Sequence, residues 1–329
     1  MRVWFLKETK TIDVDCGTGT NITLWTREDK VYRITPRQND AVNSCWMPDS
    51  HRLNYKYINA ETRIPQPVIR TDAEAPHRPS TWEPALASAA EAVKRIAPNQ
   101  LAIIASGRMT NEELYMVRHL AAQIGTDMVD IVPRMGESDG MLISADRNPN
   151  TNGARLVLDI EPGSRLDAIR EGVRSGSIKG ILSLGEDLIS PEAGFTAEDL
   201  DKLDYLFMTA HSANETARHA DLVLPGVTYA EKFGTMINVT GRIQRLNRAI
   251  QPIGYARDDW QIFRDITLLL GGNPALKDFN SALDILTAMS TEYGALNGVS
   301  WGSIGDGGQP ILETGVTIPV VEREKNQGR

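Results

Sequence analysis

From residue 80 onward, short apolar runs alternate with amphipathic segments, and no other feature constrains the fold of this chain as much. Short apolar runs between turn residues are typical of buried strands, and the segments between them have helical spacing. The predicted strands cover residues 101–105, 128–132, 156–160, 180–185, 205–208 and 222–224. Repeated strand–helix units imply parallel strands joined by right-handed crossovers. We therefore expect an α/β fold with a doubly wound, mostly parallel sheet.

Two capping boxes indicate where helices of this sheet begin. Ser80-Thr81-Trp82-Glu83 precedes a helix predicted over residues 84–96, and Thr110-Asn111-Glu112-Glu113 opens a helix that ends before Gly125. In each pattern, a hydroxyl and a carboxylate three residues apart satisfy free backbone N–H groups at the helix start. A further helix is expected over residues 164–173.

Residues 1–57 have a different pattern and predict a small β-rich domain. Residues 21–27 alternate with period two, residues 28–30 form a turn, and residues 31–34 return the chain as a hairpin.

The other domain boundaries follow from composition. Residues 58–80 contain four prolines and predict an extended linker. Residues 81–275 form the predicted α/β domain, and residues 276–329 a C-terminal helix and tail. In this last part only residues 281–293 have a helical pattern, so we expect the end of the chain to be partly ordered.

Composition and charge exclude several classes of protein. The net charge is −8 with acids and bases interleaved, which does not attract phosphate backbones, so we expect no nucleic-acid partner. No run of about 18 apolar residues could span a membrane. The apolar start is interrupted at Lys7, too soon for a signal peptide. We therefore expect no direct membrane insertion.

The chain has only two cysteines, Cys16 and Cys45. Two thiols are too few for a disulfide framework, and a cubane iron–sulfur cluster needs about four thiolate ligands. The five histidines are scattered, with no pair at zinc-ligand spacing near a cysteine. The composition therefore predicts no metal in this chain.

Three polar features could carry chemistry, and for each the sequence favours a structural interpretation. Gly17-Thr18-Gly19-Thr20 lacks the third glycine and the following helix of a phosphate-binding loop, which favours a tight turn between strands. Glu186 and Asp187 follow a buried strand, where α/β sheets bind ligands, but we expect them to begin a loop and pair with nearby bases. His211 beside Ser212 could suggest hydrolysis. Without a nucleophile elbow, Ser212 is expected to cap a helix.

The segment 220–244 is the richest in chemical features. A buried strand ends at a Pro-Gly turn, a short charged helix follows, and an extended stretch then carries Asn238, Gly241, Arg242 and Gln244. A glycine lets the backbone approach another group closely, and arginine forms paired hydrogen bonds to phosphate or carboxylate. These four residues are candidates for a ligand pocket.

This segment resembles the signature of the molybdopterin oxidoreductase superfamily, through Ala220-Asp221-x-Val-Leu-Pro, Glu231-Lys232-x-Gly-Thr and Gly241-Arg242-x-Gln. The start of the chain narrows the resemblance to the large iron–sulfur subunit of respiratory NADH:quinone oxidoreductase (complex I), called the G subunit in bacteria and the 75 kDa subunit in mitochondria. The motifs that carry it include Lys7-Glu8-Thr9-Lys10-Thr11-Ile12-Asp13-Val14, Gly19-Thr20-Asn21-Ile22 and Val42-Asn43-x-x-Trp46. The likeness covers most of residues 2–270.

The resemblance implies that residues 1–57 are a degenerate four-iron cluster domain. Relatives that bind this cluster use four cysteines, and by motif those positions fall at Asp13, Cys16, Thr20 and Pro48. From the resemblance we also expect this chain to be without the family's N-terminal ferredoxin-like domain. We therefore expect no cofactor, no metal ligand and no catalytic residue in this chain, and we expect the four candidates of segment 220–244 to be a vestigial pocket.

For function, the resemblance implies a non-catalytic scaffold subunit, or a split part, of the peripheral arm of NADH:quinone oxidoreductase. Its partners would be peripheral-arm subunits that carry flavin and iron–sulfur clusters, including a chain with the ferredoxin-like cluster domain. The complex would hold it on the cytoplasmic face of the inner membrane. Two alternatives stay open, namely a small molybdopterin-dependent oxidoreductase and a free-standing anion-binding or assembly protein.

A small domain that has lost a metal must be stabilised in another way, because metal ligation can contribute more than about 10 kcal/mol to small folded units. The apolar side chains expected around the former site are Trp4, Phe5, Ile12, Ile22, Trp25 and Trp46. We expect this unit to pack against the α/β domain and partner subunits, with Trp46 as a buried anchor.

Overall fold

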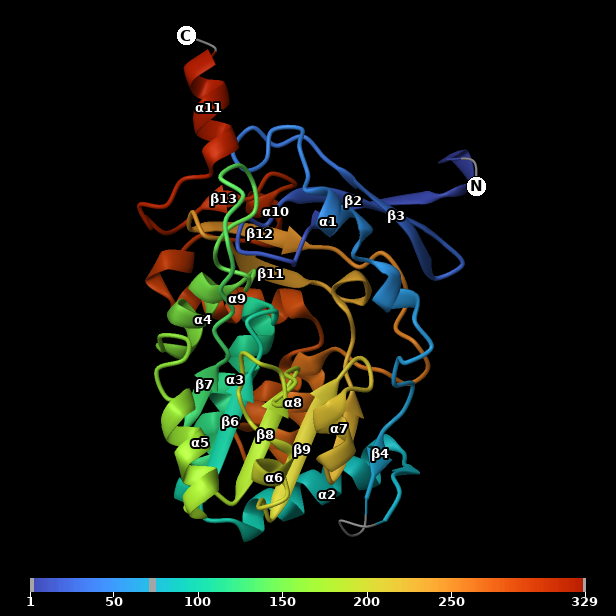
Figure 1. Ribbon diagram of the computed structural model, residues 1–329, viewed down its shortest axis with the longest axis vertical. Coiled ribbons are helices and arrows are strands. Elements are labelled where there is room, and N and C mark those ends of the chain that lie inside the picture. Colours follow the sequence, from blue (N-terminus) through green and yellow to red (C-terminus); the bar gives the residue numbers. More distant parts are fainter. Residues whose placement is uncertain (1–2, 71–74, 328–329) are drawn as a thin grey trace.

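In the computed structural model, which describes residues 3–70 and 75–327, a seven-stranded sheet forms the centre of the chain (Figure 1). Its strands are β4 (Val68–Ile69), β5 (Arg78–Pro79), β6 (Leu101–Ala105), β7 (Val129–Ile131), β8 (Gly180–Leu184), β9 (Tyr205–Ala210) and β10 (Leu222–Pro225). The order is β5-β4-β10-β9-β8-β6-β7. Strands β10 to β7 in this order are parallel, and β4 and β5 pair antiparallel at one edge. The predicted α/β fold is confirmed.

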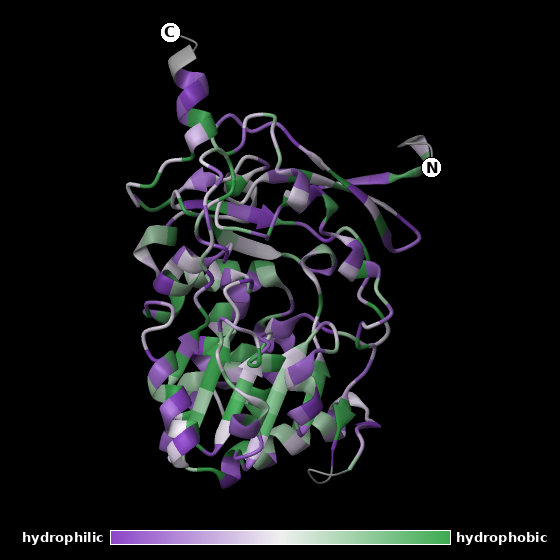
Figure 2. Cartoon of the chain, viewed as in Figure 1, coloured by the Kyte–Doolittle hydropathy of each residue, from purple (hydrophilic) through white to green (hydrophobic). Residues whose placement is uncertain are grey.

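Helices cover both faces of this sheet because its strands are apolar on both sides. In β6, Leu101, Ile103 and Ala105 face one hydrophobic core, whereas Ala102 and Ile104 face another. The first core includes residues of α2 (Trp82–Arg95), α3 (Asn111–Ile124) and α8 (Asp259–Leu269), and the second includes residues of α5 (Leu166–Ser175), α6 (Ala197–Leu200) and α7 (Glu215–His219). Figure 2 shows the central strands as the most continuous hydrophobic part of the chain.

Only one of the two predicted capping boxes forms. Thr110 Oγ1 accepts from the Glu113 N–H at 3.2 Å, and Glu113 Oε2 accepts from the Thr110 N–H at 2.8 Å. The box predicted at Ser80 is wrong, because α2 begins at Trp82 and its N-cap residue Thr81 makes no side-chain capping bond.

The strand predicted over residues 156–160 is wrong, because this segment ends the helix α4 (Thr151–Leu158). Asn150 Nδ2 donates to Met109 O at 2.8 Å and so fixes the chain just before the helix. Ala154 and Val157, three residues apart on one helical face, are buried in the main core. The apolar run alone does not distinguish a short buried strand from a helix.

The N-terminal part forms a separate antiparallel sheet of β1 (Lys7–Ile12), β2 (Asn21–Arg27) and β3 (Lys30–Pro36), with the predicted hairpin between β2 and β3. Its buried side chains Ile12, Ile22 and Leu24 pack with Met236 and Leu246 of a third sheet. This sheet contains β11 (Gly234–Ile237), β12 (Arg242–Leu246) and β13 (Gln309–Pro310). The contacts hold the small sheet against the rest of the chain.

The aromatic side chains expected to fill this unit are mostly at its surface. Trp46 is 50% exposed in this chain, Trp4 71% and Phe5 57%, so the prediction that the α/β domain buries Trp46 is wrong, and its burial against partner subunits stays a prediction. Trp46 donates its indole N–H to Glu324 at 3.3 Å, near the C-terminal end of the described chain. Aliphatic side chains form the core of the unit instead.

The C-terminal part contains more helices and strands than the single helix that the sequence predicted. Ile285, Leu286 and Met289 of α9 (Ala282–Glu292) are buried in the main core, and β13 extends the third sheet. The last helix, α11 (Pro319–Gln327), projects from the body (Figure 1). The partly ordered tail stays a prediction, and residues 328–329 of it lie outside the described residues.

The remaining elements are short. They are α1 (Asp49–Leu53), α10 (Trp301–Ile304) and the 3-10 helices η1 (Val3–Phe5), η2 (Lys56–Asn59), η3 (Pro98–Gln100), η4 (Tyr229–Glu231), η5 (Pro274–Asp278) and η6 (Gly294–Leu296). Residues 1–2 of the predicted N-terminal domain and 71–74 of the predicted linker lie outside the described residues. In the part that is described, no helix combines the length and apolarity needed to cross a membrane.

Candidate functional site

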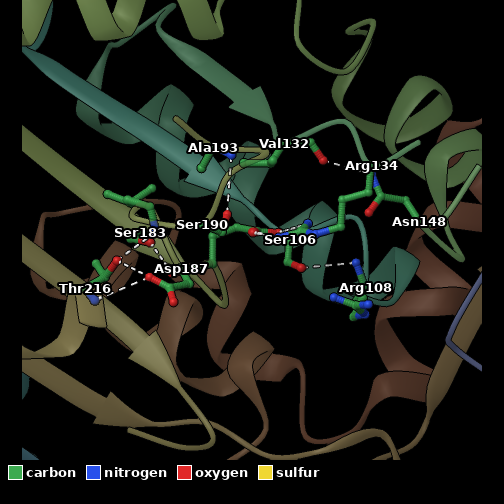
Figure 3. Close-up of polar contacts among 12 residues, drawn as sticks. Ser106, Arg108, Val132, Arg134, Asn148, Ser183, Asp187, Ser190, Ala193 and Thr216 are labelled. Carbon is green, nitrogen blue, oxygen red and sulfur yellow. Dashed lines mark hydrogen bonds and ion pairs between the residues drawn. The ribbon is translucent and has the colours of Figure 1, made fainter. Parts of the chain in front are cut away.

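Polar side chains gather at the carboxyl ends of the parallel strands, as Figure 3 shows. Ser106 and Arg108 follow β6, Arg134 follows β7, and Glu186 follows β8. Arg134 Nη1 lies 2.8 Å from Glu186 Oε1, and its other terminal nitrogen bonds the second carboxylate oxygen. Glu186 is buried, and a paired guanidinium is the partner that a buried carboxylate requires. The prediction that Glu186 pairs with a nearby base is confirmed.

Asp187 has a different partner from the one predicted. Thr216 Oγ1 donates to Asp187 Oδ1 at 2.6 Å, and the same hydroxyl accepts from the Leu188 N–H at 2.7 Å. The predicted pairing with a base is wrong, because Asp187 binds a hydroxyl that joins the loop after β8 to α7. Asp187 is therefore a structural residue of this loop.

His211 is exposed and lines a small, partly open cavity of about 120 Å³ together with Arg108 and Lys232. Although His211 is exposed at one side, loss of hydration in the cavity, followed by the positive charges of Arg63, Lys232 and Arg108, lowers its pKa to about 4. Such a side chain is neutral at pH 7 and a weak base. Its Nδ1 lies 2.9 Å from Ser212 Oγ.

Ser212 does not have the role predicted for it. The residue that caps α7 is Asn214, whose side chain accepts from the Ala217 N–H at 2.8 Å. The predicted helix cap at Ser212 is therefore wrong.

The four candidates of segment 220–244 contact other parts of this chain. Asn238 Nδ2 donates to Thr18 O at 3.0 Å, and Gln244 Nε2 donates to Gly19 O at 2.9 Å. Arg242 Nη1 donates to Gly308 O at 2.8 Å. These bonds join the N-terminal loop and the C-terminal segment to the third sheet.

Gly241 is the fourth member of this set. It has φ +77°, and a Cβ there would lie 2.2 Å from Leu312 O. The absence of a side chain at Gly241 therefore lets the backbone of Leu312, in this same chain, approach closely.

A group of metal-ligand side chains lies in the N-terminal unit. Asp13 directly follows β1, and His51 belongs to α1, which begins after Pro48. His51 Nδ1 lies 2.6 Å from Asp13 Oδ2, and their side chains are 7% and 3% exposed. One ligand atom each from Asp13, Asp15 and His51 lies within 4.8 Å of the others. We call these three residues the Asp–Asp–His group.

The charges of this group affect one another. Burial and then the neighbouring Asp13 carboxylate raise the pKa of Asp15 to about 6. Burial alone would lower the pKa of His51, but its hydrogen bond with Asp13 and the charges of both aspartates raise it. Sequence reasoning missed Asp15 and His51, since 38 residues separate His51 from Asp13.

Cys16 and Thr20 lie in the same loop, which turns as predicted through Gly19 with φ +64°. Burial and then the Asp13 charge raise the pKa of the Cys16 thiol. Thr20 is fully buried, and its hydroxyl has no hydrogen-bond partner in the structure. Cys45 is exposed. The loop thus offers one buried thiol among oxygen and nitrogen donors.

Comparison with known proteins finds two family models. Residues 140–267 match the molybdopterin oxidoreductase model, and residues 6–56 match the NADH-ubiquinone oxidoreductase NDSU1/NuoG-like 4Fe-4S domain. Acetylene hydratase from Pelobacter acetylenicus shares the fold, with a TM-score of 0.64 and 10% identity over 90% of this chain and 73% of that chain.

Two sequence relatives match different lengths of this chain. A putative formate dehydrogenase of Staphylococcus haemolyticus is 32% identical over 43% of this chain and 15% of its own length. The mitochondrial NADH-ubiquinone oxidoreductase 78 kDa subunit of Candida albicans is 25% identical over 85% of this chain and 55% of its own length. The chain thus spans about half the length of the complex I relative that it matches.

The fold and the matched regions define an α/β protein of the molybdopterin oxidoreductase type. More particularly, the chain is a G-subunit-like protein of the NADH-quinone oxidoreductase (complex I) kind, as the resemblance in its motifs implied.

The expectation that this chain holds no cofactor is wrong. The match of residues 6–56 to a 4Fe-4S domain points to an iron–sulfur cluster site in this chain. The donors present differ from the four thiolates that bind such a cluster, because Cys16 is the only cysteine among the positions Asp13, Cys16, Thr20 and Pro48. These residues do not fit a cluster held by four thiolates of this chain.

Proposed function

We propose that this chain is a structural subunit of a NADH:quinone oxidoreductase assembly. The observation that carries the proposal is its similarity, over 85% of its length, to the 78 kDa subunit of NADH-ubiquinone oxidoreductase. The NuoG-like match at residues 6–56 supports the same assignment. Electron transfer from NADH to quinone would be the activity of the whole assembly.

Contacts inside the chain support a structural role for the molybdopterin-type region. Asn238 and Gln244 bind backbone carbonyls of the loop after β1, and Gly241 packs against Leu312. A pterin-dependent enzyme would need side chains of this segment for its cofactor. Here they hold three parts of the chain together, which favours a scaffold over the alternative of a small molybdopterin-dependent oxidoreductase.

The partners in this proposal are other peripheral-arm subunits, which carry flavin and iron–sulfur clusters. The chain would then lie at the cytoplasmic face of the inner membrane through the complex.

Purification from native membranes tests the proposal. A tag after α11, which projects from the body, should recover this chain with flavin- and cluster-carrying subunits after mild detergent extraction. An untagged strain is the control, and mass spectrometry identifies the chains. Recovery of the chain alone, or with about one equivalent of pterin and molybdenum, would contradict it and favour the enzyme alternative.

A further inference from the structure

The small cavity lined by His211 lies where the connections of the central sheet change direction. From β6 the chain continues outward to β7, whereas from β8, on the other side of β6, it continues through β9 to β10. The carboxyl ends of two strands that diverge in this way are the usual place for a ligand in an α/β sheet. Ser106 and Gly185, which follow β6 and β8, line this cavity. We call it the strand-end cavity.

Arg108 brings a positive charge without a partner to this cavity. It is exposed and lines both the strand-end cavity and the open cavity of about 600 Å³ beside it. Its backbone N–H donates to Ser106 Oγ at 3.2 Å (Figure 3), but within the described residues its guanidinium forms no ion pair or hydrogen bond. Lys232 differs, because its Nζ lies 2.8 Å from both carboxylate oxygens of Glu113.

Two tyrosine hydroxyls supply further donors. Tyr229 is only 6% exposed, Tyr57 is half-buried, and both line the cavity. In the part of the chain that the structure describes, neither hydroxyl forms a hydrogen bond. Burial raises the pKa of both hydroxyls, so both keep their protons at neutral pH. A buried hydroxyl without a partner is costly, and a ligand that accepts a hydrogen bond would remove this cost.

The charges around the cavity favour a negative ligand of low charge. The positive charges of Arg63, Lys232 and Arg108 lower the pKa of His211, as expected where the potential is positive. Asp259 is the carboxylate that lines the cavity. Burial raises its pKa to about 7, so it is only partly ionised at pH 7 and would repel a monovalent anion less than a divalent one.

We propose that the strand-end cavity binds one small monovalent inorganic anion, of the class of chloride, through Arg108 and the hydroxyls of Tyr57 and Tyr229. A guanidinium and two hydroxyls are all donors, which suits an anion. The volume of about 120 Å³ is well below the roughly 300–1,000 Å³ of sites for larger ligands, so a nucleotide or a pterin does not fit. The inference does not depend on the proposed subunit role.

The line width of the ³⁵Cl NMR signal in a solution of the purified full chain at pH 7 tests the site, because chloride broadens when it binds to a protein. We expect broadening that saturates with chloride. Binding should be at least about tenfold weaker in Arg108→Gln, which loses a charge-assisted contact, and about 2–10-fold weaker in Tyr229→Phe, which loses one hydrogen bond. Thermal unfolding verifies that each variant folds, and Arg108 is exposed, so its substitution best preserves the fold.

Matched controls exist for both variants. The hydroxyl of Tyr205 is also buried without a partner, but Tyr205 does not line this cavity, and Arg218 is an exposed arginine elsewhere. Tyr205→Phe and Arg218→Gln should therefore bind chloride as the unmodified chain does. Gluconate, which is too large for the cavity, should not displace chloride at constant ionic strength. Broadening without saturation, equal binding by Arg108→Gln and Arg218→Gln, or displacement by gluconate would overturn the proposal.

Discussion

Arg63 and Glu231 form a buried ion pair, with Arg63 Nη2 2.6 Å from Glu231 Oε2 and side chains that are 2% and 1% exposed. Arg63 also donates to Ile58 O and His211 O. Glu231 accepts from the Thr228 and Ile253 N–H groups. The pair thus ties the segment after the N-terminal sheet to the molybdopterin-type region.

Removal of one partner of this pair should strongly destabilise the chain. We expect Arg63→Met to lower the free energy of unfolding by about 3–5 kcal/mol, because it leaves Glu231 buried and unpaired. Urea unfolding measures the change. Arg218→Met is the control, since its pair with Glu215 is exposed and should contribute about 0–1 kcal/mol. Equal effects of the two substitutions would contradict the structural role of Arg63.

Trp46→Ala should have little effect on stability, since the side chain is 50% exposed. We expect a loss below about 1 kcal/mol, as is usual for surface substitutions. Phe263→Ala, in the main core and fully buried, should cost about 3–5 kcal/mol. Thermal or urea unfolding compares them. A loss at Trp46 as large as that at Phe263 would restore the buried anchor that the sequence suggested.

Glu112 should make stability depend on pH. Burial raises its pKa from 4.5 to about 7, although Thr235 donates two hydrogen bonds to it. Because the pKa of Glu112 is higher in the folded state, folding favours the protonated carboxyl. Its contribution to the free energy of unfolding is complete below about pH 4.5 and is lost as pH rises through 7. The loss is on the order of 3 kcal/mol.

Glu112→Gln removes this titration. Urea unfolding between pH 4 and 8 should show a flatter pH dependence in the variant, whereas Glu91→Gln, an exposed control, should keep the original one. Superimposable pH profiles for Glu112→Gln and the unmodified chain would show that Glu112 is already ionised in the folded state.

Gly241→Ala should be more destabilising than Gly176→Ala, although the backbone is nearly the same at the two positions. The φ angles are +77° and +78°, but a Cβ at 241 would lie 2.2 Å from Leu312 O, and a Cβ at 176 has no heavy atom within 4 Å. We expect a loss of about 1–2 kcal/mol at Gly176 from backbone strain alone. A clearly larger loss at Gly241 in urea unfolding would confirm the close packing, and equal losses would contradict it.

The sequence predicted the central sheet well because its signals are local. The run Leu101–Ala105 and the box Thr110–Glu113 specify a buried strand and a helix start through neighbouring residues alone. The run ending at Ile160 was predicted as a strand because so short a segment has no distinctive period. Asn150, just before α4, forms hydrogen bonds with Met109 and Ile237, which are distant in the sequence. Ile285 and Met289 are buried by packing in the main core, against residues that are distant in the sequence, so their burial could not be predicted from neighbouring residues.

The sequence identified some residues of the candidate site but not the contacts that bring them together. Asp13 stood out through its motif, but its contact with His51 depends on how the chain folds back at α1. In the same way, Asn238 and Gln244 were recognised by resemblance, while their bonds to Thr18 and Gly19 join residues more than 200 positions apart. Tertiary contacts of this kind have no signal in a single sequence.

Membranes from cells that naturally make this chain give the most direct test of the proposed subunit role. NADH-dependent quinone reduction should fall to background when the gene is deleted and return when the unmodified chain is supplied. NADH oxidation by an artificial acceptor and the amounts of the other subunits would be followed in the same membranes. Unchanged quinone reduction in membranes without this chain would contradict the proposal.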